Sequence, residues 1–157
     1  MEMEYLQLRN NDVVPALDHL RPFKCVLLID SDFSTAWQKK ISERLVKSGC
    51  YYLMPWGKNA SSWNDAIDSA LLAQFNYQAI PAESSIMTSW YDYGSTMDLF
   101  AFCKGMAKHE VQQLDNTLVL HISETDRAES ILRNYCAAGS LHVGGKATLR
   151  ERALAWG

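Results

Sequence analysis

One apolar run constrains the fold more than any other feature of the chain. Residues 23–29 follow Pro22 and read FKCVLLI, so six of these seven residues are apolar. A strand that is apolar on both faces is typical of the interior of a parallel sheet, because helices cover both sides of such a sheet. Residues 23–29 are therefore predicted to form the central strand of an α/β domain.

Strand-like and helix-like segments alternate along the rest of the chain. Further strands are predicted at residues 50–54, 85–90 and 117–122. Helices are predicted between and after these strands, at residues 34–49, 61–75, 95–107 and 125–136. Four strand–helix repeats with short connections favour a mainly parallel sheet with helices on both faces. The predicted fold is a single three-layer α/β domain, Rossmann-like or flavodoxin-like, with about four strands.

Length and composition agree with one domain. The chain has 157 residues, of which 48% are hydrophobic and 21% charged, and these values are ordinary for a globular domain. The core is expected to span about residues 20–139. Residues 140–157 are expected to form a C-terminal extension that adds a short strand and a helix or frays.

Several classes of protein are disfavoured by the sequence. No apolar run approaches the roughly 20 residues that span a bilayer, and residues 1–8 contain Glu2 and Glu4 but no basic segment of a secretory signal. The net charge of −3 does not favour binding to nucleic acid or to a membrane. The four cysteines form no CxxC pair and are expected to be reduced thiols. We therefore expect a cytoplasmic protein.

Acidic and aromatic side chains follow the predicted strands. The carboxyl ends of parallel strands share one edge of a sheet, where ligands bind at the point at which the strand order reverses. The binding candidates at this edge are Trp56, Lys58, Trp90, Tyr91, Asp92 and Glu124. Such a surface suits a basic protein or a cationic small molecule. The favoured hypothesis is a non-enzymatic protein-binding protein, for example an immunity or inhibitor protein, that needs no cofactor; its oligomeric state stays open.

The alternative hypothesis is a Mg²⁺-dependent phosphohydrolase. The segment Asp30-Ser31-Asp32 after an apolar strand resembles the first motif of the haloacid dehalogenase superfamily. The resemblance implies that Asp30 is a nucleophile and Asp32 an acid/base, that both hold Mg²⁺, and that Thr88 binds phosphate beside Lys104 or Lys146. The acidic pair that this superfamily carries after a late strand is missing, since residues 121–124 read HISE.

Each of these residues also has an ordinary structural interpretation. Asp32 and Ser34 precede a predicted helix, where side-chain oxygens commonly cap the first backbone amides. His121 lies inside an apolar strand, and a histidine in that position is more often a hydrogen-bonded core residue than a catalyst.

Four short segments carry a second resemblance. They read SGCYYLMPWG from residue 48, SSWNDAID from residue 61, MTSW from residue 87 and LHIS from residue 120. Together they resemble a small family of uncharacterised bacterial proteins, over roughly residues 20–125. The resemblance implies a bacterial, cytoplasmic protein and supplies no catalytic residues.

Overall fold

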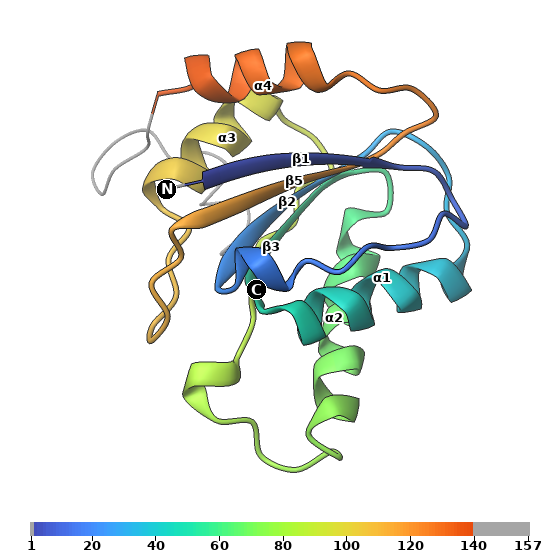
Figure 1. The fold of residues 1–157 in the computed structure, drawn as a ribbon, viewed down its shortest axis with the longest axis vertical. Helices are drawn as coiled ribbons and strands as arrows, with labels where there is room; N and C mark the ends of the chain where they lie inside the picture. The colour runs from blue at the N-terminus through green and yellow to red at the C-terminus, as the bar shows by residue number, and fades with distance from the viewer. Residues whose placement is uncertain (1, 140–157) are drawn as a thin grey trace.

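A five-stranded sheet in the order β1-β5-β2-β3-β4 separates two layers of helices (Figure 1). The computed structural model describes residues 2–139. The strands are β1 (Glu2–Leu8), β2 (Phe23–Ile29), β3 (Cys50–Gly57), β4 (Met87–Thr88) and β5 (Asn116–Ile122). Every pair of neighbouring strands is parallel. The predicted parallel α/β fold is confirmed, with five strands rather than about four.

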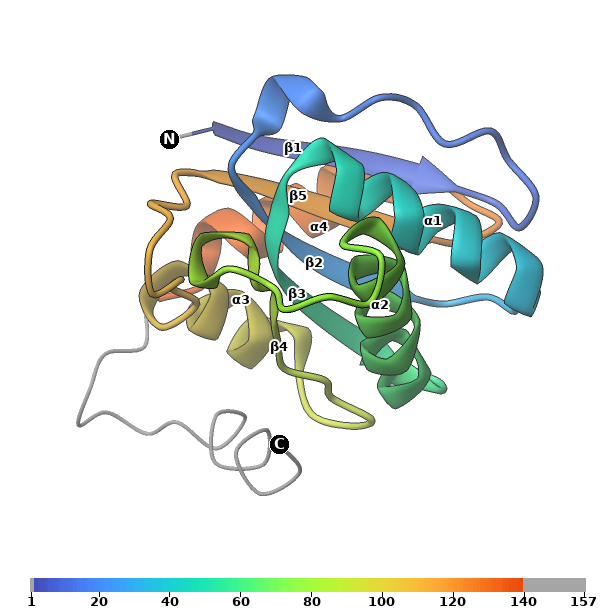
Figure 2. The ribbon, with the colours of Figure 1, turned by 90° about the horizontal axis from the view of Figure 1, so that it is seen from below.

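Two helices cover each face of the sheet. The helices are α1 (Thr35–Ser48), α2 (Ala60–Gln74), α3 (Thr96–Gly105) and α4 (Ala128–Ala137), with 3-10 turns η1 (Asp18–Leu20) and η2 (Ala82–Ser84). Figure 2 shows α1 and α2 in front of the sheet, with α3 and α4 behind it. Among the residues that the structure describes, no helix has the length and apolar character to cross a membrane.

The central strand is buried on both faces, as its sequence predicts. All seven residues of β2 are buried. Phe23, Cys25 and Leu27 pack into the core under α1 and α2. Val26 and Leu28 pack into the second core under α3 and α4. The alternation of side chains along one strand therefore joins the two hydrophobic cores.

Two strands differ from the predictions. β1 was not predicted, because Glu2, Glu4 and Gln7 interrupt its apolar pattern; it is an edge strand that pairs only with β5 among the described residues. The strand predicted at residues 85–90 contains only Met87 and Thr88 in regular pairing. The strand and helix predicted for residues 140–157, together with Lys146, lie outside the described residues.

The helix ends follow the sequence closely. The Ser34 hydroxyl accepts a hydrogen bond from the Trp37 amide at 3.2 Å, and Gly49 ends α1 with φ 96°. The Ser95 hydroxyl caps α3 in the same way, accepting from the Asp98 amide at 3.1 Å. These caps fix where the loops at the carboxyl ends of the strands turn into helices.

Candidate functional site

The strand order reverses between β2 and β5. The chain proceeds outward from β2 through β3 to β4, and then returns to place β5 on the other side of β2. The carboxyl ends of β2 and β5 lie together there, and the Asp30 amide donates to the Ile122 carbonyl at 2.9 Å. This is the position at which open parallel sheets commonly bind ligands.

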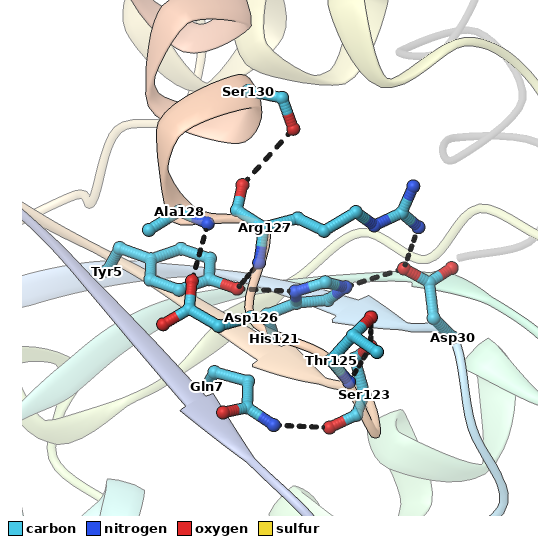
Figure 3. A network of polar contacts seen from close by, with 10 residues as sticks. All are labelled: Tyr5, Gln7, Asp30, His121, Ser123, Thr125, Asp126, Arg127, Ala128 and Ser130. Atoms are coloured by element: carbon cyan, nitrogen blue, oxygen red, sulfur yellow. Dashed lines mark hydrogen bonds and ion pairs between the residues drawn. The ribbon is translucent and has the colours of Figure 1, made fainter.

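A buried histidine organises the side chains at this point (Figure 3). His121 is 0% exposed, with Nδ1 2.6 Å from the Tyr5 hydroxyl and Nε2 2.5 Å from Asp30 Oδ2. A neutral imidazole protonated at Nε2 satisfies both contacts, because Nε2–H donates to Asp30 while Nδ1 accepts from Tyr5. The prediction of a hydrogen-bonded core histidine is confirmed.

Arg127, at the start of α4, contacts both Asp30 and Tyr5. Its Nη2 lies 3.3 Å from Asp30 Oδ2, and its backbone amide donates to the Tyr5 hydroxyl oxygen at 3.2 Å. Burial raises the pKa of the Tyr5 phenol above its ordinary value. The phenol therefore stays protonated and able to donate at neutral pH. We call Tyr5, Asp30, His121 and Arg127 the polar network.

Asp32 lies apart from the polar network. Its carboxylate is 91% exposed and pairs with Lys58 Nζ at 3.3 Å, on a cavity of about 280 Å³ that Ser31 and Asn59 also line. Ser34 rather than Asp32 caps α1, so the expected capping role of Asp32 is wrong. Asp30 is not among the residues that line this cavity.

The structure therefore gives the two aspartates different partners. His121 and Arg127 both contact Asp30 Oδ2, so a Mg²⁺ ion bound to this oxygen would have to displace them. Within residues 2–139, no group of three or more His, Cys, Asp or Glu side chains is placed to hold a metal ion. Thr88 lies on β4 with its hydroxyl buried, and Lys104 donates to the Ala138 carbonyl at 2.8 Å. This arrangement does not favour the phosphohydrolase hypothesis.

Aromatic side chains dominate the edge beyond β3 and β4. Trp56 and Trp90 are partly exposed, Tyr93 is 53% exposed and Met97 is 37% exposed. The Trp56 indole donates to the Gly94 carbonyl at 3.1 Å, which ties the end of β3 to the loop before α3. We call Trp56, Trp90, Tyr93 and Met97 the aromatic rim.

Three other predicted binding residues have clear positions. Tyr91 is only 1% exposed because its ring packs against Phe102 in the core, so the expectation that its side chain contributes to a binding surface is corrected. Asp92 is exposed beside Tyr93. Glu124 is exposed and pairs with Arg9 at 3.5 Å, on the side of the polar network.

Sequence reasoning missed two members of the polar network. Tyr5 is 116 residues from His121, and Arg127 is 97 residues from Asp30. Neither belongs to a local motif with its partner. The available signal was a lone histidine in an apolar strand, which needs polar partners when it is buried.

The chain was also compared with known families, proteins and structures. Residues 3–138 match the family model of a domain of unknown function (DUF7684). The match agrees with the expectation of an uncharacterised family. No curated protein and no solved structure matches the chain.

Proposed function

The chain belongs to the DUF7684 family, and we propose that it is a bacterial, cytoplasmic binding protein that engages another protein through the aromatic rim. An immunity or inhibitor protein is an example of this class. The proposal assigns no catalytic step and no cofactor to the domain.

One observation carries the proposal: the carboxyl edge beyond β3 and β4 exposes large apolar side chains, whereas nearby acidic side chains pair with cations. Asp30, Asp32 and Glu124 are each held by a cationic partner in the structure. The aromatic rim instead exposes large apolar side chains, including 53% of Tyr93 and 37% of Met97. Aromatic residues and methionine are enriched in protein interfaces because they offer a large contact area.

The charges beside the rim indicate the partner. Asp92 and Asp98 are exposed on either side of Tyr93 and Met97 in the sequence. Carboxylates attract a basic surface and raise its rate of association, and aromatic rings bind lysine and arginine side chains over their faces. A partner with arginine or lysine residues on its contact surface fits the rim best.

Affinity purification from a bacterial lysate tests the proposal with the tagged chain as bait. We expect a partner that is recovered by the wild type, is lost with Trp90→Ala plus Tyr93→Ala, and dissociates at high salt. Tyr77→Ala plus Val111→Ala is the matched control, since these side chains are 74% and 55% exposed and lie outside the rim. Equal recovery by the rim variant and the control would overturn the proposal.

A further inference from the structure

The exposed face of α1 carries a concentration of positive charge. Lys39, Lys40, Arg44 and Lys47 are all exposed, whereas the whole chain has a net charge of −3. In the ion pairs of residues 2–139, none of these four side chains takes part. Glu43, the acidic residue of α1, is half-buried between them. We call the four cations the basic ridge.

A groove lies beside three of the four cations of the ridge. The segment between β1 and η1 runs beside α1 (Figure 2) and forms the opposite wall of a groove of about 460 Å³. Lys40, Arg44 and Lys47 line the α1 side of this groove together with Trp37 and Glu43. The other side is lined by Asn11, Asp12, Val13 and Val14, so cations outnumber carboxylates in the groove.

Hydrogen bonds fix the wall of the groove to α1. The Trp37 indole donates to the Asp12 carbonyl at 2.9 Å, and the Ser34 amide donates to Asn10 Oδ1 at 2.9 Å. The Asp12 carboxylate accepts from the Arg9 amide at 2.7 Å, and among residues 2–139 it forms no ion pair with a cation of the ridge. Val13 directly follows the last of these contacts and is 90% exposed.

We propose that the basic ridge and Val13 form a docking surface for a short acidic segment of another protein, separate from the aromatic rim. Lys40 and Lys47 are seven residues apart on α1, which corresponds to about 10 Å along the helix axis. An extended segment of about three residues covers that length. Its carboxylates would meet the cations, and an apolar side chain beside them would cover Val13.

Charge complementarity favours an acidic protein segment over the other ligands that this groove could bind. The chain's own residues 140–157 contain Lys146, Arg150 and Arg152 against Glu151, so they carry the same sign as the ridge. A nucleic acid offers negative charge but no flexible aliphatic side chain to cover Val13. An acidic protein segment supplies both kinds of contact, and it requires no change in the aromatic rim.

Fluorescence anisotropy with a labelled peptide of glutamate and leucine tests the proposal. We expect the wild type to bind this peptide and Lys40→Glu plus Arg44→Glu to weaken binding by about tenfold or more, because opposite charges become like charges. Lys108→Glu plus Arg133→Glu is the control, since it makes the same change in net charge at exposed positions outside α1. Val13→Ser is expected to weaken binding by a few-fold at every salt concentration, because it removes an apolar contact.

Two further measurements test the alternative ligands of this surface, a nucleic acid and a second copy of the chain. An oligonucleotide of deoxythymidine that binds more tightly than the acidic peptide would overturn the proposal in favour of a nucleic-acid surface. Sedimentation that shows ridge-dependent self-association would overturn it in favour of a second copy of the chain. Absence of peptide binding, or an equal loss in the ridge and control variants, would contradict it outright. Trp90→Ala plus Tyr93→Ala should leave peptide binding unchanged, which separates this proposal from the one for the rim.

Discussion

The polar network and the aromatic rim lie at the same edge of one sheet. The network side chains contact one another, whereas the rim side chains are more exposed to solvent. In the network, each residue contacts at least one other member, and His121 is completely buried. In the rim, Tyr93 and Met97 expose much of their side chains to solvent. The comparison teaches that a cluster of hydrogen-bonded polar side chains, such as the polar network, need not be the binding surface.

The network side chains contact one another because a buried polar group without a hydrogen-bond partner destabilises the fold. A buried imidazole without partners would be strongly destabilising, so its two hydrogen bonds stabilise the fold whatever else they do. These bonds join β1, β2 and β5 to the start of α4. Exposed apolar side chains contribute little to folding, and contiguous ones often mark binding surfaces. We therefore assign a stabilising role to the network and propose the rim as the binding surface.

The largest expected effect is that of His121→Leu. The substitution removes hydrogen bonds to Tyr5 and Asp30 and should lower the free energy of unfolding by about 3 kcal/mol. Urea denaturation measures this change. His19→Leu is the control, because the His19 side chain is 54% exposed and contacts Glu4 at the surface; a change of similar size there would contradict the special position of His121.

The next largest effect is the expected difference in stability between the Asp30→Ala and Asp32→Ala variants. Asp30→Ala removes the acceptor for His121 and Arg127 and is expected to cost about 2 kcal/mol. Asp32→Ala breaks a surface ion pair with Lys58, and such pairs contribute about 0–1 kcal/mol. Thermal denaturation of both variants in the same buffer gives the comparison. Equal costs would show that Asp30 is no more integrated into the fold than Asp32.

Tyr5→Phe should have a smaller effect that depends on pH. Loss of the hydroxyl is expected to cost about 1 kcal/mol at pH 8. The pKa of Tyr5 is raised in the folded protein, so the neutral phenol stabilises the fold fully below its unfolded pKa of about 10. That contribution is lost as the pH rises through the higher folded pKa.

The difference between wild type and Tyr5→Phe should therefore shrink above pH 10. Urea denaturation at several pH values between 8 and 11 measures it. Tyr93→Phe is the control for tyrosine ionisation at an exposed position. A difference that grows with pH would contradict the role given to the neutral Tyr5 hydroxyl.

The smallest expected effect on stability comes from the rim. Tyr93→Ser plus Met97→Ser should change the free energy of unfolding by less than about 0.5 kcal/mol, because substitutions at exposed positions rarely do more. Urea denaturation again provides the measurement. A cost near that of His121→Leu would mean that the rim holds the fold together and is not reserved for contacts.

The sequence predicted the parts of the molecule whose signals are local. The apolar run at residues 23–29 predicts a central buried strand, and Ser34 and Gly49 predict the ends of α1. β1 escaped prediction because an edge strand tolerates polar residues such as Glu4 and Gln7, which weaken its pattern. β4 was predicted, but as residues 85–90, whereas only Met87 and Thr88 pair regularly.

The candidate site was predictable only in part. The position of Asp30 and Trp56 at the carboxyl edge follows from the order of strands and helices along the chain. The partners of His121 do not, because Tyr5 and Asp30 are brought to it by parallel pairing between distant strands. The burial of Tyr91 was also beyond the sequence, since residues 90 and 91 differ in exposure only through packing against α3.

The most direct test of the account measures partner recovery and urea denaturation for two variants, one in the aromatic rim and one in the polar network. Tyr93→Ser plus Met97→Ser should lose the partner and keep the urea midpoint of the wild type. Tyr5→Phe should keep the partner and unfold at lower urea. Loss of the partner in Tyr5→Phe together with full recovery by the rim variant would contradict the account, because it would place binding at the polar network.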